Sequence, residues 1–168
     1  MTYYMRNSMR EELLKLIESN SKISPSDLSK MLNVSEIDIV NELAKLEKEN
    51  VICGYQTLID WDKTNVNNVV GLIEVRITPE RGNGFDKIAE RIYNYEEVKS
   101  LYLISGAYDL LVTLEEANLK DVAEFVFDKL STIDGVVSTA THFILKKYKE
   151  HGTIFNKIEN DKREAVSL

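Results

Sequence analysis

The stretch that decides the fold is Ser24–Glu49, which reads SPSDLSKMLNVSEIDIVNELAKLEKE. It opens with a helix start, because Ser24 is an expected N-cap, Pro25 suits the first helical position, and Asp27 is placed to complete a capping box. The pattern therefore predicts a short helix that ends at Leu32.

A second helix start follows the predicted turn Asn33-Val34. Ser35 is the expected N-cap and Asp38 its reciprocal partner three residues later, and the helical periodicity continues to about Glu49. Apolar residues recur at helical spacing, so one side of this helix is expected to face a core. The residues expected to face inward are Ile39, Val40, Leu43 and Leu46.

A further amphipathic helix is expected upstream, over residues 9–19. Three helices of this length with a short connection predict a helix-turn-helix unit. The first two helices would brace the third, whose opposite face stays exposed, and an exposed helix of that diameter fits the major groove of DNA. The expected exposed stripe, at spacings of four, four and three, consists of Ile37, Asn41, Lys45 and Lys48.

These residues suggest distinct contacts with double-stranded DNA. We expect Asn41 to read base edges and Lys45 and Lys48 to contact phosphates. Ser35, with the backbone N–H groups that follow it, suits a phosphate at the helix N-terminus. Charge opposes this interpretation, because five acidic residues lie between Ser35 and Glu49, and acids that face phosphate lower the affinity.

Residues 1–60 hold seven basic and ten acidic side chains, a net charge of −3, and the whole chain of 168 residues has a formal charge of −7. These counts exclude a uniformly basic nucleic-acid-binding protein, so any DNA contact has to be local. The alternative is an oligomeric ligand-sensing and protein-interaction module with weak or no DNA binding. Two helix-turn-helix units (DNA-binding heads) in a dimer, or eight in an octamer, would strengthen weak single contacts with DNA through avidity.

The pattern changes near residue 60. Residues 51–59 are β-prone and predict an exit strand, which would make residues 1–60 a winged-type helix-turn-helix domain. Residues 61–68 are polar and predict a hinge. Residues 156–168 form a polar tail that is expected to be frayed.

Residues 69–155 predict a ferredoxin-like βαββαβ domain, so the fold class is α+β. The expected strands are 69–78, 98–105, 108–114 and 136–148, and the expected helices are 84–94 and 118–130. Residues 81–85 predict a strand-to-helix turn. The residues of the second helix expected to face inward are Leu119, Val122, Ala123, Val126, Phe127 and Leu130. Two helices cover only one face of the sheet, so the other face predicts self-association, most simply as a two-fold dimer.

The loop Ser105-Gly106-Ala107-Tyr108-Asp109 is a candidate effector site. Gly106 permits a tight turn that exposes backbone amides to a carboxylate, and Asp109 can pair with an ammonium group, so together they suit an α-amino acid. The alternative is a β-hairpin in which Asp109 satisfies turn amides. Thr139 and Thr141 face one side of a strand and are candidates to complete the site, although threonine is common in strands.

The joint pattern resembles the Lrp/AsnC family of bacterial and archaeal transcription regulators over residues 9–155. The resemblance is carried by Ser105–Asp109, by Val137–Thr141, and by the run Ile23-Ser24, Asp27-Leu28-Ser29, Val34-Ser35 and Leu46–Tyr55. It implies a DNA-binding transcriptional regulator whose second domain senses an amino acid or related metabolite and builds dimers and often octamers. It also implies that Thr139 and Thr141 lie near the bound effector.

Other classes of function find little support in the composition. The chain has two histidines and no nucleophile elbow or phosphate-binding glycine motif, so we expect no enzyme, no catalytic residues and no cofactor. Its single cysteine, Cys53, excludes an internal disulfide and a cysteine-rich metal site and fits a reducing cytoplasm. The sequence shows neither a signal peptide nor an apolar run of membrane-spanning length, so no membrane partner is expected.

Overall fold

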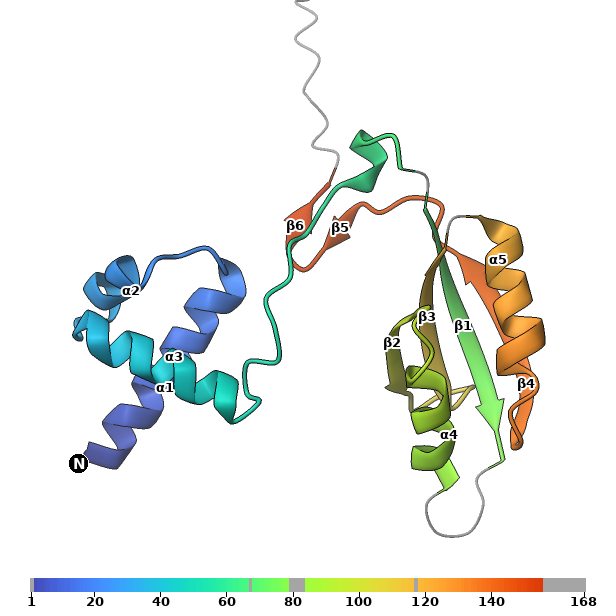
Figure 1. The fold of residues 1–168 in the computed structure, drawn as a ribbon, viewed down its shortest axis with the longest axis horizontal. Helices are drawn as coiled ribbons and strands as arrows, with labels where there is room; N and C mark the ends of the chain where they lie inside the picture. Colours follow the sequence, from blue (N-terminus) through green and yellow to red (C-terminus); the bar gives the residue numbers. More distant parts are fainter. Residues whose placement is uncertain (1, 67, 79–83, 117, 156–168) are drawn as a thin grey trace, which may run out of the picture. The chain divides into compact units, whose positions relative to one another are not determined.

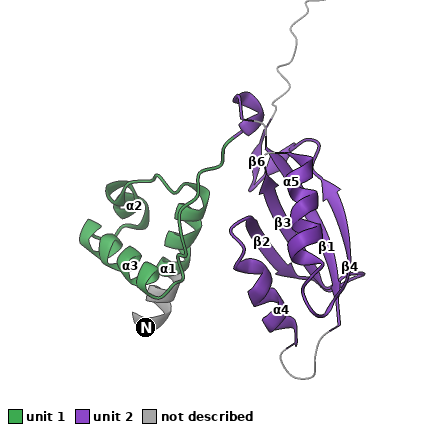
Figure 2. Cartoon of the chain, turned by 45° about the vertical axis from the view of Figure 1, so that its right-hand side comes forward, with its two compact units in different colours: residues 1–59 green, residues 60–168 purple. Residues whose placement is uncertain are grey.

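The computed structural model describes residues 2–66, 68–78, 84–116 and 118–155. The chain divides into two compact units, residues 1–59 and 60–168 (Figure 2), and each is described by itself. In the described part of the chain, none of the helices combines the length and apolar character needed to cross a membrane.

The first unit consists of α1 (Thr2–Ser19), α2 (Pro25–Leu32) and α3 (Glu36–Lys48) (Figure 1). One side chain from each of α1 and α2 and two from α3 are fully or almost fully buried and form the core, namely Leu13, Leu28, Ile39 and Leu46. The helix-turn-helix expectation is therefore confirmed. The first helix begins seven residues earlier than expected.

The prediction that Val40 of α3 faces the core is wrong, because this side chain is 48% exposed. Ile39, Leu43 and Leu46 recur at intervals of four and three residues and so share one face of the helix. Val40 follows Ile39 directly and is rotated by about 100° around the axis, which carries it off that face.

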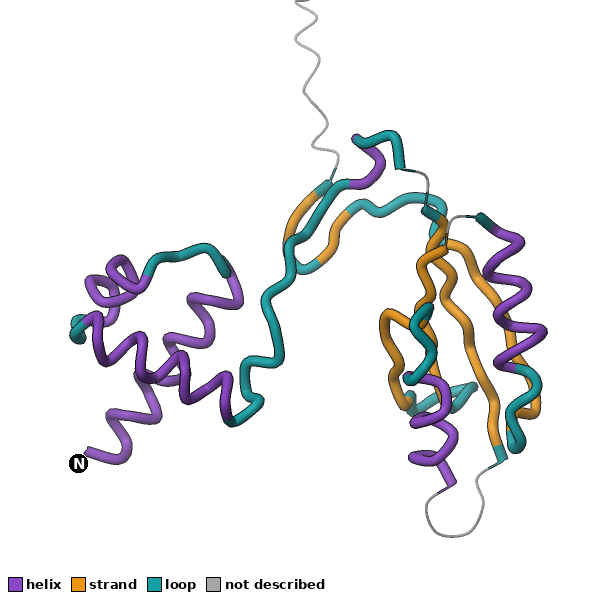
Figure 3. Tube along the Cα trace, viewed as in Figure 1, coloured by secondary structure: helices purple, strands orange, loops and turns teal. Residues whose placement is uncertain are grey.

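The strand expected over residues 51–59 is also wrong, since this segment is an irregular loop (Figure 3). A strand needs a partner for its backbone hydrogen bonds, and the described residues of the first unit contain no other strand. The β-branched and aromatic residues of segment 51–59 favour an extended backbone locally, but they do not supply the partner strand. A short 3-10 helix, η1 (Trp61–Lys63), follows within the expected hinge.

The second unit contains a four-stranded antiparallel sheet with the strand order β2-β3-β1-β4. In chain order its elements are β1 (Val69–Ile77), α4 (Gly84–Tyr93), β2 (Val98–Leu103), β3 (Leu110–Glu116), α5 (Leu119–Glu124), η2 (Phe125–Leu130) and β4 (Val136–Phe143). Both helices cover one face of the sheet, as Figure 1 shows, which confirms the ferredoxin-like fold.

The last strand ends at Phe143 and not at residue 148 as expected, and a small hairpin of β5 (Lys149–Glu150) and β6 (Thr153–Ile154) follows. The expected turn at residues 81–85 falls mostly on residues outside the described part of the chain, and the expected tail at residues 156–168 lies wholly outside it.

The core of this unit lies between the sheet and the two helices. Burial alternates along β1, where Ile73, Val75 and Ile77 face the helices while Glu74 and Arg76 face the opposite side. The register places residues of β3 and β4 directly beside these positions, so it also assigns the faces of the neighbouring strands.

The second helix departs from the expected phase. The α-helical α5 continues as η2, a π-helical segment, in which Phe125 is 4% exposed and Phe127 is 78% exposed. The wider π-turn brings Phe125 and Leu130, five residues apart, to the same buried side. Three residues that were expected to face inward are exposed: Leu119, Ala123 and Phe127. Leu119 and Ala123 lie in α5 itself, about 60° and 100° around the helix from the buried Val122, and Phe127 lies in the π-helical segment.

Candidate functional site

The α2–α3 connection is fixed by local hydrogen bonds that the sequence encodes. The Ser24 hydroxyl accepts from the N–H of Asp27 at 3.1 Å and donates to its carboxylate at 2.6 Å. The Ser35 hydroxyl does the same with Asp38, at 3.1 and 2.7 Å. Asn33 ends α2 with a φ of 52°, in the left-handed region. Both expected N-caps are confirmed, so the start of α3 is held in one position.

The side of α3 opposite the core is exposed, as expected. Asn41, Lys45 and Lys48 are exposed, as is Ser35 at the N-cap, and Ile37 is 73% exposed. An apolar residue, an amide and two ammonium groups can contact a thymine methyl, a base edge and phosphates respectively. The helix thus presents the side-chain types that reading a major groove requires.

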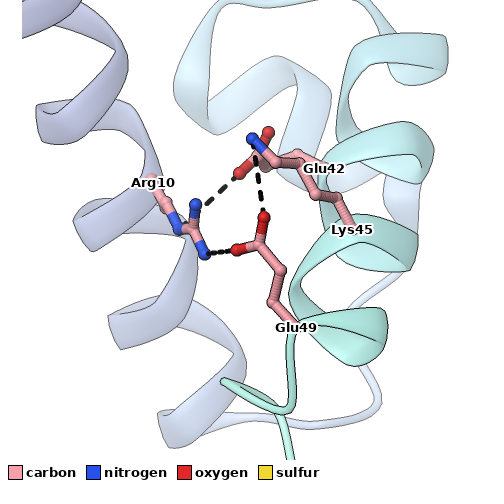
Figure 4. A network of polar contacts seen from close by, with 4 residues as sticks. All are labelled: Arg10, Glu42, Lys45 and Glu49. Atoms are coloured by element: carbon pink, nitrogen blue, oxygen red, sulfur yellow. Dashed lines mark hydrogen bonds and ion pairs between the residues drawn. The ribbon is translucent and has the colours of Figure 1, made fainter.

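Four of the five acidic residues between Ser35 and Glu49 have a partner within the first unit. Arg10 of α1 contacts Glu42 at 3.7 Å and Glu49 at 2.5 Å (Figure 4). Its hydrogen bond lowers the pKa of the Glu49 carboxyl, and Glu49 in turn raises the pKa of Arg10. Asp38 is held by the N-cap, and Glu47 accepts from the Tyr55 hydroxyl at 2.8 Å. The contact of Arg10 with Glu49 leaves no local signal in the sequence, because 39 residues separate the two.

Asp109 has a structural contact that the sequence did not reveal. Its Oδ2 accepts from the backbone N–H of Ile77 at 2.8 Å, and its own N–H donates to the carbonyl of Val75 at 3.0 Å. The carboxylate thereby binds an amide of β1, whereas the hairpin alternative placed it on turn amides. Its pairing with a ligand ammonium stays a prediction.

The rest of the loop is open to solvent. Ser105, Gly106 and Ala107 are exposed, while Tyr108 is half-buried, and the Ala107 carbonyl accepts from Arg76 Nε at 2.9 Å. Gly106 has no left-handed φ, and an added Cβ would meet only an Ile104 methyl group at 3.9 Å. The backbone therefore does not require glycine there, and among the described residues outside its chain neighbours no other atom lies within 4 Å of that Cβ position.

Thr139 and Thr141 lie opposite Val75 and Ile73 in the register of β4, so both face the helix-covered side, and the expectation that they share one side is confirmed. Val75 also pairs with Leu110, which follows Asp109. Two interstrand spacings, about 10 Å, therefore separate Thr139 from the end of the loop. Within one chain Thr139 lies toward the end of the sheet that carries the loop, Thr141 lies two residues further along β4, opposite the middle of β1, and β1 stands between both threonines and the loop.

A cavity of about 380 Å³ lies between α4 and β2. Its lining includes Leu103 and Leu110, which flank the loop 105–109, together with Lys99, Asp86 and the aromatic ring of Phe85. Sequence reasoning missed this cavity because it depends on how α4 packs against the edge strand. Its size and mixed lining suit a small ligand with an apolar part and charged groups.

Residues 71–154 match the family described as the Lrp/AsnC ligand binding domain. The chain is 48% identical over 157 residues to the helix-turn-helix-type transcriptional regulator YugG of Bacillus subtilis, covering 93% of this chain and 95% of that protein. It is 26% identical to the leucine-responsive regulatory protein of Haemophilus influenzae, covering 83% of each.

Solved structures share the fold. A transcriptional regulator of Neisseria meningitidis in complex with L-methionine matches with a TM-score of 0.67 and 22% identity, covering 88% of this chain and 94% of that one. AsnC of E. coli matches with a TM-score of 0.64 and 17% identity, covering 85% of this chain and 94% of that one.

Proposed function

The chain belongs to the Lrp/AsnC family of transcriptional regulators, and on this premise we propose that it binds double-stranded DNA through α3 and responds to an amino acid or a closely related metabolite. The observation that carries the DNA-binding part is the exposed stripe of α3, held on a helix whose start is capped and whose other side is buried.

In the proposed complex, the N-terminal half of α3 lies in the major groove. Asn41 reads a base edge and Ile37 contacts a thymine methyl, which together provide sequence preference. Lys45, Lys48 and the backbone N–H groups beside Ser35 contact phosphates and provide most of the salt-dependent affinity. The internal pairing of Glu42 and Glu49 with Arg10 supports this arrangement, because it reduces the repulsion that their charges would exert on the phosphates.

Self-association is the second part of the proposal. The sheet face opposite the helices carries Val70, Leu72 and Leu111, which stay half-buried, beside Tyr102, which is 54% exposed. Covering these side chains with a second copy would bury apolar area and place two DNA-binding heads in one particle. A dimer of this kind, or a higher assembly such as an octamer, would raise the affinity for paired half-sites.

The effector site is proposed at the loop 105–109 and the adjoining cavity between α4 and β2. The exposed amides of Ser105–Ala107 suit a carboxylate, the second carboxylate oxygen of Asp109 suits an ammonium group, and the apolar lining suits a side chain. Thr139 and Thr141 would take part from a neighbouring subunit, because β1 separates them from the loop of their own chain. A ligand changes the assembly only if it binds one assembly state more tightly than another.

A protein-interaction role for the first unit is favoured by the exposed apolar side chains of α3, Ile37 and Val40. A salt titration separates the two roles. Specific DNA binding that falls steeply as salt rises supports the DNA-binding role, whereas a lack of binding to genomic fragments at low salt supports the protein-interaction role.

A further inference from the structure

The four charged residues in Figure 4 form one connected cluster between two helices. Arg10 on α1 donates through Nη2 to Glu49 at 2.5 Å, and its Nε lies 3.7 Å from Glu42. The second oxygen of Glu49 lies 3.9 Å from the ammonium of Lys45. Glu49 is therefore shared between a cation on α1 and a cation on α3.

The two carboxylates of this cluster lie beside Lys45, a proposed phosphate contact, and so affect the charge that DNA meets there. At 100° per residue, Glu49 lies about 40° and Glu42 about 60° around the helix from Lys45, on the side away from Asn41. Lys45 is thus the boundary between the exposed stripe and the acidic pair. Both carboxylates lie within a Debye length of any phosphate that Lys45 contacts, so their charge acts on that phosphate.

The charges in the cluster cancel only when Arg10 is present. With Arg10, two cations face two carboxylates. Without it, Lys45 is the remaining cation of the cluster beside both Glu42 and Glu49. The nearer carboxylate, Glu49, then competes with DNA for the Lys45 ammonium, and the local charge becomes more negative by one unit for each head.

We propose that Arg10, which lies outside the helix that reads DNA, is a positioning residue for DNA binding: it holds the carboxylates of Glu42 and Glu49 on the α1 side and leaves Lys45 available to a phosphate. This inference rests on the proposed DNA-binding function of α3. It assigns to α1 an electrostatic role in addition to its packing role, through a residue that itself touches no base.

The experiment compares the wild-type protein, Arg10→Gln, Glu42→Gln/Glu49→Gln and the triple variant on one DNA fragment over a range of salt concentrations. Arg10→Gln is expected to weaken binding by roughly three- to tenfold and to reduce the salt slope by about one for each head that engages DNA. The triple variant is expected to bind at least as tightly as the wild type and to recover its slope, because neutral amides of the same shape replace both carboxylates and the charge of each head is one unit more positive than in the wild type.

A purely structural role gives a different pattern. If Arg10 acted only by joining α1 to α3, the triple variant would bind as weakly as Arg10→Gln, and that result would overturn the proposal. Arg10→Lys retains the charge and is expected to keep the wild-type salt slope. Circular dichroism verifies that each variant is folded, and if Arg10→Gln is not, a folded triple variant still decides by binding at least as tightly as the wild type or more weakly.

The outcome also separates this proposal from the function on which it rests. A wild-type protein that binds no DNA at low salt contradicts the DNA-binding function itself. A wild-type protein that binds DNA with a salt slope equal to that of Arg10→Gln contradicts only the role of Arg10.

Discussion

Asp109 lies beside Ile77 at the end of β1, with 2.8 Å between its Oδ2 and the backbone nitrogen of Ile77. The β1–β3 ladder has its last paired residues at Val75 and Leu110, so the carboxylate provides the next acceptor after the ladder. The same residue is the proposed partner of a ligand ammonium. Its two roles, in folding and in binding, can be separated by substitution.

Asp109→Ala leaves the N–H of Ile77 without its acceptor and is expected to lower the free energy of unfolding by about 1–3 kcal/mol. Asp109→Asn retains an oxygen acceptor, so its free energy of unfolding should be close to that of the wild type. It loses the negative charge and should therefore lose affinity for a cationic group. Urea unfolding and calorimetric titration with amino acids measure the two effects. An Asp109→Ala variant as stable as the wild type would show that the contact with Ile77 contributes nothing.

Substitutions on α3 should separate base reading from phosphate contact. Asn41→Ala is expected to weaken the free energy of binding to the preferred site by about 1–3 kcal/mol and to change binding to unrelated DNA little, so that sequence specificity falls. Lys48→Ala is expected to weaken binding to all sequences and to reduce the salt slope by about one per head. Fluorescence anisotropy with specific and scrambled fragments measures both, with Lys15→Ala on α1 as the control for loss of a surface charge.

The capping and ion-pair contacts of the first unit predict a pH dependence of stability. The Ser24 hydroxyl lowers the pKa of Asp27, and Arg10 lowers the pKa of Glu49. Each carboxyl therefore has a lower pKa in the folded than in the unfolded chain, so its contribution is present above the unfolded value and is lost as the pH falls through the folded value. Thermal unfolding of the full chain, followed through its helix signal, should show this loss in acid.

Glu49→Gln removes one of these titrating groups, so its thermal midpoint should depend less on pH in the acid range than that of the wild type. Glu11→Gln, a change at an exposed position of α1, serves as the matched control. Equal pH dependence in the wild type and in Glu49→Gln would count against the role of the Arg10–Glu49 pair in stability.

In the π-helical segment η2, Phe125 is buried and Phe127 is exposed, so their side chains should contribute very differently to stability. Phe125 is buried and meets Tyr95 edge to face with 5.4 Å between ring centroids, so Phe125→Ala is expected to destabilise the second unit by about 3–5 kcal/mol. Phe127→Ser changes an exposed side chain and should shift the stability of one chain by less than about 0.5 kcal/mol. Chemical denaturation measures both, and similar losses in the two variants would contradict the observed phase.

Local signals in the sequence predicted much of this fold. The two N-caps at Ser24 and Ser35 depend on residues three positions apart, and both are confirmed. The βαββαβ order follows from alternating strand and helix periodicities, which are also local. The strand expected over residues 51–59 was wrong because a strand depends on a partner that periodicity does not reveal, and the phase of Phe127 was wrong because a π-turn leaves no mark in a 3.6-residue pattern.

In the candidate site, too, features set by local sequence could be predicted, whereas features set by long-range contacts could not. Exposure of Ile37, Asn41, Lys45 and Lys48 follows from helix geometry and is found in the structure. The engagement of the acidic residues by Arg10, and of Asp109 by Ile77, required contacts between residues more than 30 positions apart. The same long-range packing creates the cavity between α4 and β2.

Whether α3 reads DNA is decided by selecting bound fragments from the host genome and titrating the recovered site with salt, for the wild type and for Asn41→Ala. If α3 reads DNA, the wild type enriches palindromic sites with an affinity that falls steeply with salt, and Asn41→Ala loses the preferred site. No enrichment at low salt, or enriched sites that Asn41→Ala binds equally well, would contradict DNA reading by α3.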